Sequence, residues 1–409
     1  MRRAVLCAAL MAMFLPCSAG AQSVMLTEAD ALARLSTDSP RVRAIRSGVD
    51  VARVDVLAAG RWPNPRLTVD RESVAGVTEY LTMIAQPLPI TGRRDLDVQA
   101  ASARAAAVAG RADDDVRRLR ADLRLAFADL LSAQVRVTEL TAARDRLRAL
   151  ADVLAKRESA GDAAGFDRLR ADREAFDIET DLALATSDRS RAQAALAGFL
   201  TGVTDATQLV AASRSNAPAA PIPSIDALLA RAESTRGELQ ALRHEAEGAK
   251  FSARAADRRL VPEPEVVAGT KSSTLGTGEI GSVFTVHASI PLFDHARPER
   301  ALASARAAEA DARTDAFRQM LRSQVAALRA VVTERREVAD RYRAQAVAGA
   351  AQIERIAQVS YDAGERGILE LLDAYRIGAT ARVRQAALDL GVRQAEIELE
   401  FVTGWEAPL

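Results

Sequence analysis

Two long stretches of the chain carry apolar residues at steps of about seven positions, with polar residues between them. The first runs from Arg93 to about Arg157 and the second from Pro298 to Ser360. The periodic residues are Leu123, Leu130, Val137, Leu140, Leu147 and Leu154 in the first stretch, and Leu321, Val325, Leu328 and Val332 in the second. This spacing predicts long amphipathic helices. At ~1.5 Å per residue each would be roughly 90 Å long, so it needs neighbours along its whole length.

Four shorter segments alternate between apolar and polar residues, which predicts β-strands. The clearest is Gly281–Phe293, with Phe284, Val286, Ala288 and Ile290 on one face and Thr285, His287 and Ser289 on the other. The weaker strands contain Val266, Ala268 and Thr270; Leu67 and Val69 against Thr68 and Asp70; and Val77, Leu81, Met83 and Ala85 against Thr78, Tyr80 and Thr82. Ile84 breaks the alternation of its strand. We therefore expect two strand pairs, each with an apolar face.

The strands narrow the architectures that the helices allow. The helical pattern alone fits a coiled-coil rod as well as a tube of helices packed side by side. Strands of roughly ten residues match a transmembrane β-segment, but four strands cannot close a barrel, because single-chain barrels start at about eight. The chain then needs partners to close it, unless the strands form a small soluble sheet that caps a helical rod.

The two halves of the chain repeat the same features in the same order. Trp62-Pro63-Asn64-Pro65 corresponds to Val261-Pro262-Glu263-Pro264, and Ala160-Gly161-Asp162 corresponds to Ala363-Gly364-Glu365. Between the halves lies a segment rich in Ser, Ala and Pro, which is typical of a linker. We predict a first repeat at residues 22–212, a linker at 213–223 and a second repeat at 224–409.

The amino terminus has the pattern of an export signal. Arg2 and Arg3 precede an apolar stretch from Ala4 to Pro16, and Ala19-Gly20-Ala21 fits a signal-peptidase site. We predict a signal peptide at residues 1–21. Both cysteines, Cys7 and Cys17, lie inside it, so the mature chain would have no disulfide or Cys-ligated metal. Phe14-Leu15-Pro16 before Cys17 matches lipoprotein processing poorly.

Composition and motifs argue against nucleic-acid binding and catalysis. Lys+Arg and Asp+Glu number 55 each, so no net charge favours a nucleic-acid partner. His244, His287 and His295 are too scattered for a zinc site, and the sequence has no phosphate-binding loop or nucleophile elbow. We predict that the protein is not an enzyme and has no catalytic residues, cofactor or stored metal ion.

Several of these motifs together resemble the TolC-type outer-membrane efflux family over essentially the whole mature length. They are the duplicated plan, the strand-to-helix junctions Gln86-Pro87-Leu88 and Ile290-Pro291-Leu292-Phe293-Asp294, and the turn Tyr361–Gly367 running into Leu369–Ala374. The resemblance implies a mainly α fold with a transmembrane β section. A homotrimer would share one outer-membrane β-barrel, four strands per protomer, and continue it as a long α-helical barrel in the periplasm.

The junction from Gln86 to Arg94 resembles the family branch that serves cobalt, zinc, cadmium or copper efflux pumps. This implies a passive outer-membrane channel of a tripartite efflux system. Its partners would be outer-membrane lipid, a periplasmic adaptor (membrane fusion) protein and an inner-membrane transporter of the resistance-nodulation-division (RND) type. The alternatives are a channel for drug efflux or type I secretion, and a periplasmic coiled-coil scaffold.

The resemblance also suggests roles for individual residues. The two hairpin tips would dock the adaptor, whereas a generic helix turn explains their glycines without a partner. The docking residues would be Gly161, Asp162, Gly364, Glu365 and Arg366. Glu370 and Asp373 share a helix face and would form acidic rings around a narrow tunnel. The latch that closes it would comprise Asp167, Tyr361 and Arg366. An ordinary solvated helix face would carry the same charged residues.

Overall fold

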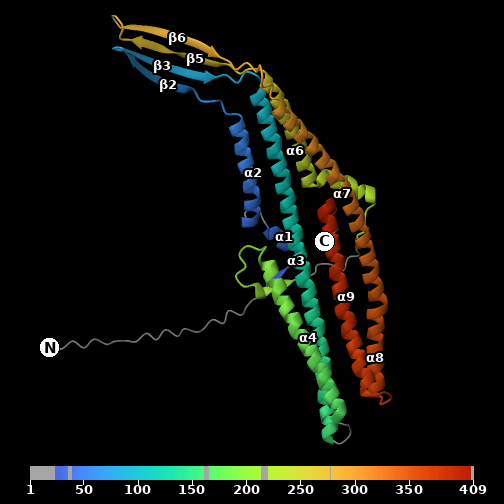
Figure 1. Ribbon diagram of the computed structural model, residues 1–409. Coiled ribbons are helices and arrows are strands. Elements are labelled where there is room, and N and C mark those ends of the chain that lie inside the picture. Colours follow the sequence, from blue (N-terminus) through green and yellow to red (C-terminus); the bar gives the residue numbers. More distant parts are fainter. Residues whose placement is uncertain (1–23, 36–38, 161–164, 213–219, 277, 407–409) are drawn as a thin grey trace, which may run out of the picture.

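The computed structural model describes residues 24–35, 39–160, 165–212, 220–276 and 278–406. Figure 1 shows an elongated molecule with a four-stranded sheet at one end, from which the helices run away side by side. The predicted signal peptide, including Cys7 and Cys17, and residues 213–219 of the predicted linker lie outside the described residues. The predicted mainly helical architecture with a β section is confirmed.

The same order of elements occurs in both halves of the chain: two shorter helices, a strand pair, a very long helix and a second long helix. In the first half the elements are β1 (Val24–Leu26), α1 (Glu28–Arg34), α2 (Pro40–Ala59), β2 (Arg66–Val74), β3 (Val77–Pro87), α3 (Arg93–Ala160), α4 (Gly165–Ala197), the 3₁₀ turn η1 (Ala206–Gln208) and β4 (Leu209–Ala211). In the second half they are α5 (Ile225–Thr235), α6 (Gly237–Asp257), the 3₁₀ turn η2 (Arg258–Leu260), β5 (Glu265–Ser273), β6 (Glu279–His287), α7 (Arg297–Tyr342), the π-helical η3 (Arg343–Val347), α8 (Ala348–Asp362) and α9 (Ile368–Thr403).

The long helix α3 has 68 residues and is the element around which the others pack. Its buried seam includes Leu123, Leu130, Leu140, Leu147 and Leu154, as the heptad spacing predicts. Figure 1 shows α6 and α9 end to end along one side of α3, with α2 and α4 along the other. Each shorter helix therefore covers part of a surface that no single partner spans.

Polar groups of α3 hold the joint between α6 and α9. Arg117 donates hydrogen bonds to the carbonyl oxygens of Thr235 and Phe401, the latter over 2.9 Å, near the carboxyl ends of α5 and α9. Asp114 accepts from the backbone N–H of Gly237 over 3.1 Å, at the start of α6. Helix ends leave such groups without partners inside the helix, so α3 satisfies them from outside.

Charged side chains connect α1, α3, α7 and α9 at mid-length. Arg124 pairs with Glu28 and Glu400, and Arg393 binds Glu28 over 2.9 Å. Arg336 of α7 adds a 2.6 Å pair with Glu396, a neighbour of Arg393. The Glu400 side chain is only 4% exposed, so its charge is compensated by arginines rather than by water.

The four antiparallel strands lie in the order β2-β3-β5-β6. Leu67, Ile84, Ala268 and Phe284 are consecutive cross-strand partners and therefore share one face. We call this the apolar face of the sheet. Within β3 the predicted alternation holds: Leu81, Met83 and Ala85 lie on the opposite face. Ile84 is the predicted exception, and the pairing places it on the apolar face. The register decides this, because it fixes which residue stands opposite Leu67.

The last strand is shorter than its sequence pattern predicts. β6 ends at His287, whose partner Glu265 is the first residue of β5. Pro262 and Pro264 precede Glu265 and lack the backbone N–H that a longer ladder would use. The predicted strand segment from Ala288 to Phe293 therefore leads out of the sheet toward α7.

A second, parallel sheet of β1 and β4 was not predicted. Val24 pairs with Leu209 and Leu26 with Ala211, so the start of the first half is held to its end. Leu26 and Leu209 are buried in a core with Leu123, Leu130 and Leu196. Strands of three residues are too short to show a period, which is why the sequence gives no sign of them.

No helix within the described ranges combines the length and the apolar character that crossing a membrane requires.

We expect Gly237→Ala to lower the thermal unfolding midpoint of the purified protein. A Cβ at this position would clash with the Gly110 carbonyl oxygen on α3. Relieving this clash would require the backbone of α3 or α6 to move. Overpacking of this kind costs about 1–3 kcal/mol. Gly48→Ala in α2 is the matched control, because nothing lies within 4 Å of its added Cβ. Equal midpoints for the two variants would contradict close packing of α6 on α3.

Candidate functional site

The turn between α8 and α9 reverses the chain at the end of the molecule opposite the sheet (Figure 1). Gly364 has φ +73°, which side-chain-bearing residues rarely adopt. Its N–H donates to the Tyr361 carbonyl oxygen over 3.0 Å, and the N–H of Glu365 donates to that of Ser360 over 2.9 Å. This Schellman arrangement satisfies the last carbonyl groups of α8. The side chains of Glu365 and Arg366 are thereby left exposed at the tip.

The end of α3 and the start of α4 pack beside α8 and α9 at the same end of the molecule. The predicted docking residues Gly161 and Asp162 lie outside the described residues. Arg168 of α4 donates to Glu158 of α3 over 2.6 Å and joins the two helices. Asp167 lies in the first turn of α4 and is half-buried.

A shared apolar core packs the two hairpin ends of one protomer together. It contains Leu147, Leu150, Ala151 and Leu154 of α3, Ala171 and Ala175 of α4, Ala357 of α8, and Ile368, Leu371, Leu372 and Ala374 of α9. Leu371 is fully buried. Because helices from both halves contribute, the two tips of a protomer form one packed unit.

The predicted acidic pair lies on the exposed side of α9, flanking the buried Leu371 and Leu372. Asp373 forms a 2.7 Å ion pair with Arg376, which raises the pKa of that arginine. Glu370 has no ion pair among the described residues. One of the two carboxylates is thus partly neutralised within the protomer and the other is not.

No side-chain hydrogen bond or ion pair joins the predicted latch residues to one another in the described part of the protomer. Tyr361 instead accepts a 3.2 Å hydrogen bond from Arg157 of α3, whose guanidinium lies 5.4 Å from the ring centre. No ion pair joins Arg366 to Asp167 in the described part of the chain. Sequence reasoning missed Arg157, because 204 positions separate it from Tyr361 and no local pattern links them.

A second polar connection lies further from the tip. Arg382 of α9 binds Glu354 of α8 and Glu139 of α3, each over 2.8 Å, and Arg146 of α3 approaches Glu354 over 3.4 Å. Tyr375 of α9 donates to Gln358 of α8, and burial raises the pKa of this tyrosine. These contacts tie α8 and α9 to α3. No local sequence pattern predicts these contacts.

The described residues hold no group of three or more His, Cys, Asp or Glu side chains that could bind a metal ion. The Nδ1 atom of His244 lies 3.3 Å from a carboxylate oxygen of Glu247. His287 ends β6, and His295 lies in the loop before α7. Of the predicted docking and gate residues, Glu365, Arg366, Glu370 and Asp373 are exposed charges at the tip end of the molecule.

Comparison with known proteins gives three kinds of similarity. Residues 228–405 match the family model of the outer membrane efflux protein. The cobalt-zinc-cadmium resistance protein CzcC of Cupriavidus metallidurans is 25% identical over 385 residues, covering 93% of this chain and 90% of CzcC. The channel CusC superposes with a TM-score of 0.77 at 16% identity, covering 94% of this chain and 93% of that one. VceC of Vibrio cholerae gives a TM-score of 0.76 at 17% identity, covering 92% and 96%.

The fold, the matched family model and the full-length relative agree with one another. The structural likeness covers 92% to 94% of the chain and therefore extends over both halves. Residues 228–405 thus match the outer membrane efflux protein family, and the chain has the fold of the TolC-like channels CusC and VceC.

Proposed function

We propose that this channel is the outer-membrane conduit of a tripartite efflux system that exports heavy-metal cations such as cobalt, zinc or cadmium. The observation that carries the proposal is the full-length match to CzcC, whose name describes cobalt-zinc-cadmium resistance. The acidic residues near the tip fit cation passage, because carboxylates around a narrow path attract cations. Energy and most of the selectivity would reside in the inner-membrane partner.

We propose that the working unit is a homotrimer. In one protomer the edges of the sheet, β2 and β6, expose unpaired backbone groups, and its apolar face is open: Phe284 is 72% exposed and Leu67 65%. Within lipid, unpaired strand edges are costly, so closure into a barrel removes them. Three copies of the four-stranded sheet would form one shared barrel.

The helical end supports the same assembly. Large apolar side chains are exposed at one-face spacing on α4, namely Phe166, Leu169, Phe176 and Leu184, and on α8, namely Ile353, Ile356 and Val359. Phe166 and Phe176 are each 66% exposed and Val359 is 68% exposed. In a trimer α8 of one copy would pack against α4 of the next, as α9 packs against α3 within the protomer. The helices would then form a closed tunnel.

The tips are the proposed contact with a periplasmic adaptor protein, which in turn would bind an RND-type inner-membrane transporter. Gly364, Glu365 and Arg366 are exposed at the slim end of the α8–α9 hairpin. Gly161 and Asp162 would contribute from the other tip. A narrow turn with charged flanks can insert between helices of a partner, whereas a bulky one cannot.

The gate would lie just above these tips. Glu370 and Asp373 from three copies would surround the tunnel, and their like charges would repel one another at close range. Closure therefore needs contacts between copies. Arg366 and Asp167 have no ion pair with each other within the protomer, so we propose that they pair between adjacent copies in a charge-assisted contact. Tyr361, held by Arg157, would stiffen the helix that carries Arg366.

We expect a strain that lacks this channel to become sensitive to cobalt, zinc or cadmium salts. Loss of the conduit would trap the cations on the inner side of the outer membrane. Growth across a panel of metals and drugs measures this, with complementation by Gly48→Ala as the control for expression. Sensitivity to drugs alone would contradict the metal substrate while leaving the channel role intact.

We expect Gly364→Trp to abolish efflux resistance while the protein still assembles. The bulky ring would widen the tip, although the positive φ adds strain of about 1–2 kcal/mol. Gly364→Asn is the matched control, since Asn tolerates this conformation and stays slim. The readouts are migration as a trimer and metal resistance. Normal resistance in the tryptophan variant would argue against docking at this tip.

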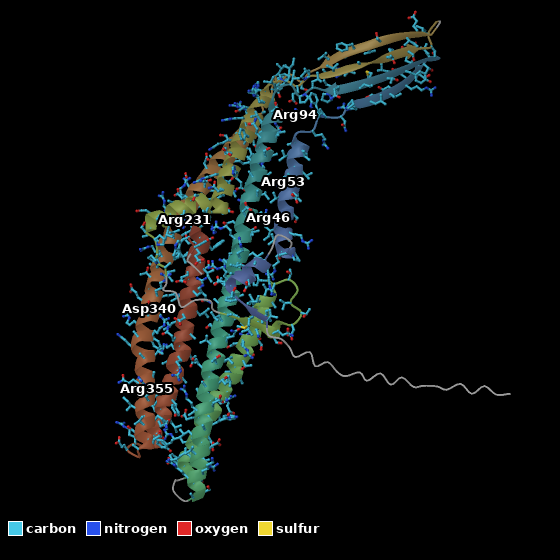
Figure 2. The ribbon with its side chains drawn as sticks, turned by 180° about the vertical axis from the view of Figure 1, so that it is seen from behind. Arg46, Arg53, Arg94, Arg231, Asp340 and Arg355 are labelled. Atoms are coloured by element: carbon cyan, nitrogen blue, oxygen red, sulfur yellow. The ribbon has the colours of Figure 1, made fainter. Side chains whose placement is uncertain are left out.

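We expect Arg366→Ser to raise single-channel conductance in planar bilayers, because it removes the cation of the proposed latch. Arg355→Ser is the control: Arg355 is an exposed arginine of α8 (Figure 2) whose Nε donates only to its own helix, at the Ala351 carbonyl oxygen. The control should conduct as the unmodified protein does. If both variants behave alike, Arg366 belongs to an ordinary helix surface.

A further inference from the structure

The apolar face of the sheet has a defined edge on the side of the helices. Val286, Phe284 and Ile84 are each more than half exposed on this face. The strands have 9 to 11 residues, the length that spans a bilayer core. In an outer-membrane protein this face meets lipid. Its helix-proximal edge therefore lies where the acyl chains end and the phospholipid headgroups of the periplasmic leaflet begin.

Trp62 lies at this edge. Gln86 follows Ile84 by two positions and therefore shares the apolar face, and its Nε2 donates to the Pro63 carbonyl oxygen over 3.0 Å. This bond holds the residue next to Trp62 against the last row of the sheet. The Trp62 side chain is 53% exposed. A half-exposed indole at the margin of an apolar face is the arrangement that tryptophan adopts at membrane interfaces.

Two arginines accompany the indole. The Arg94 guanidinium lies 5.1 Å from the centre of the Trp62 ring, and its Nη1 donates to the Gly60 carbonyl oxygen over 3.3 Å. Arg94 is paired only loosely with Asp95, at 3.7 Å. Arg61 is exposed and has no ion pair in the described part of the chain. Figure 2 shows Arg94 at the bend between the sheet and the helices, whereas Arg53 and Arg46 lie further along α2.

We propose that Trp62, Arg94 and Arg61 form a binding site for an anionic phospholipid of the periplasmic leaflet. The indole lies at the boundary between headgroups and acyl chains, and the two guanidinium groups bind phosphodiester oxygens, for which the planar donors of arginine are suited. Ile90, which is 68% exposed in the loop between β3 and α3, adds anchoring surface. The site fixes the depth of the channel in the membrane and does not depend on which substrate is exported.

The chain contains two tryptophans, which allows a direct test of depth. Trp405 is 6% exposed in the helical core, so Trp405→Phe leaves Trp62 as the sole reporter. The full-length variant is reconstituted into vesicles whose acyl chains carry bromine either near the headgroup or near the bilayer centre. We expect shallow bromines to quench the emission more strongly than deep ones. Absence of quenching, or stronger quenching by deep bromines, would overturn the proposal.

A complementary variant keeps the test valid if Trp405→Phe does not fold. Trp62→Phe removes the proposed reporter, and its remaining emission comes from the buried Trp405. Subtracting its quenching from that of the unmodified protein gives the contribution of Trp62. We expect the remaining signal to show little quenching at either depth. Depth-dependent quenching that persists in Trp62→Phe would place the interfacial tryptophan elsewhere and refute the site.

The role of the arginine is tested by the lipid headgroup. We expect phosphatidylglycerol, added to phosphatidylcholine vesicles, to raise the thermal unfolding midpoint of the reconstituted protein, and Arg94→Gln to lose most of that increase. Arg53→Gln, which removes an exposed arginine of α2 away from the bend, should retain it. Equal responses in both variants would mean that the headgroup effect is nonspecific, and the proposed phosphate contact would be rejected.

Discussion

The length of α3 is the constraint on which the rest of this structure depends. A helix of 68 residues, about 100 Å long, cannot bury its apolar seam against itself, so other helices must cover it along its whole length. The chain meets this requirement with shorter helices placed end to end, α6 with α9 and α2 with α4. The joint between α6 and α9 is then a weak point, and Asp114 and Arg117 of α3 satisfy the helix ends that meet there.

The same packing leaves surfaces that one protomer cannot cover. Phe166 and Phe176 on α4 and Val359 on α8 are about two-thirds exposed, whereas the apolar residues Ala171, Ala175 and Ala357 of the same helices are buried. The sheet is also incompletely covered: its edge strands are unpaired on one side and its apolar face is exposed. Both ends of the molecule thus favour association, the sheet with lipid and further strands and the helices with further helices. In the proposed trimer, closing both surfaces with the same symmetry would form the tunnel.

Several charged residues near the middle of the molecule are buried in ion pairs, whereas several at the tip are exposed. Near mid-length, carboxylates such as Glu400 and Glu396 are buried and matched by arginines, which holds α3, α7 and α9 in register. At the tip, Glu370 and Arg366 are exposed and have no ion pair among the described residues. Buried pairs cannot rearrange cheaply, whereas exposed charges can exchange partners at little cost. This contrast suits a rigid helical body at mid-length and a tip whose ion pairs can change.

The sequence by itself determined the elements whose cause is local. The heptad spacing predicted α3, the alternation predicted the strand pairs, and Gly364 predicted the turn. Each of these elements depends on residues close together in the chain. The tips and acidic residues were named from the family resemblance. Only the tertiary structure decided the face of Ile84, the pairing of β1 with β4, the contact of Arg157 with Tyr361 and that of Trp62 with Arg94. Strand register and contacts between distant helices depend on how whole elements pack, which no local pattern records.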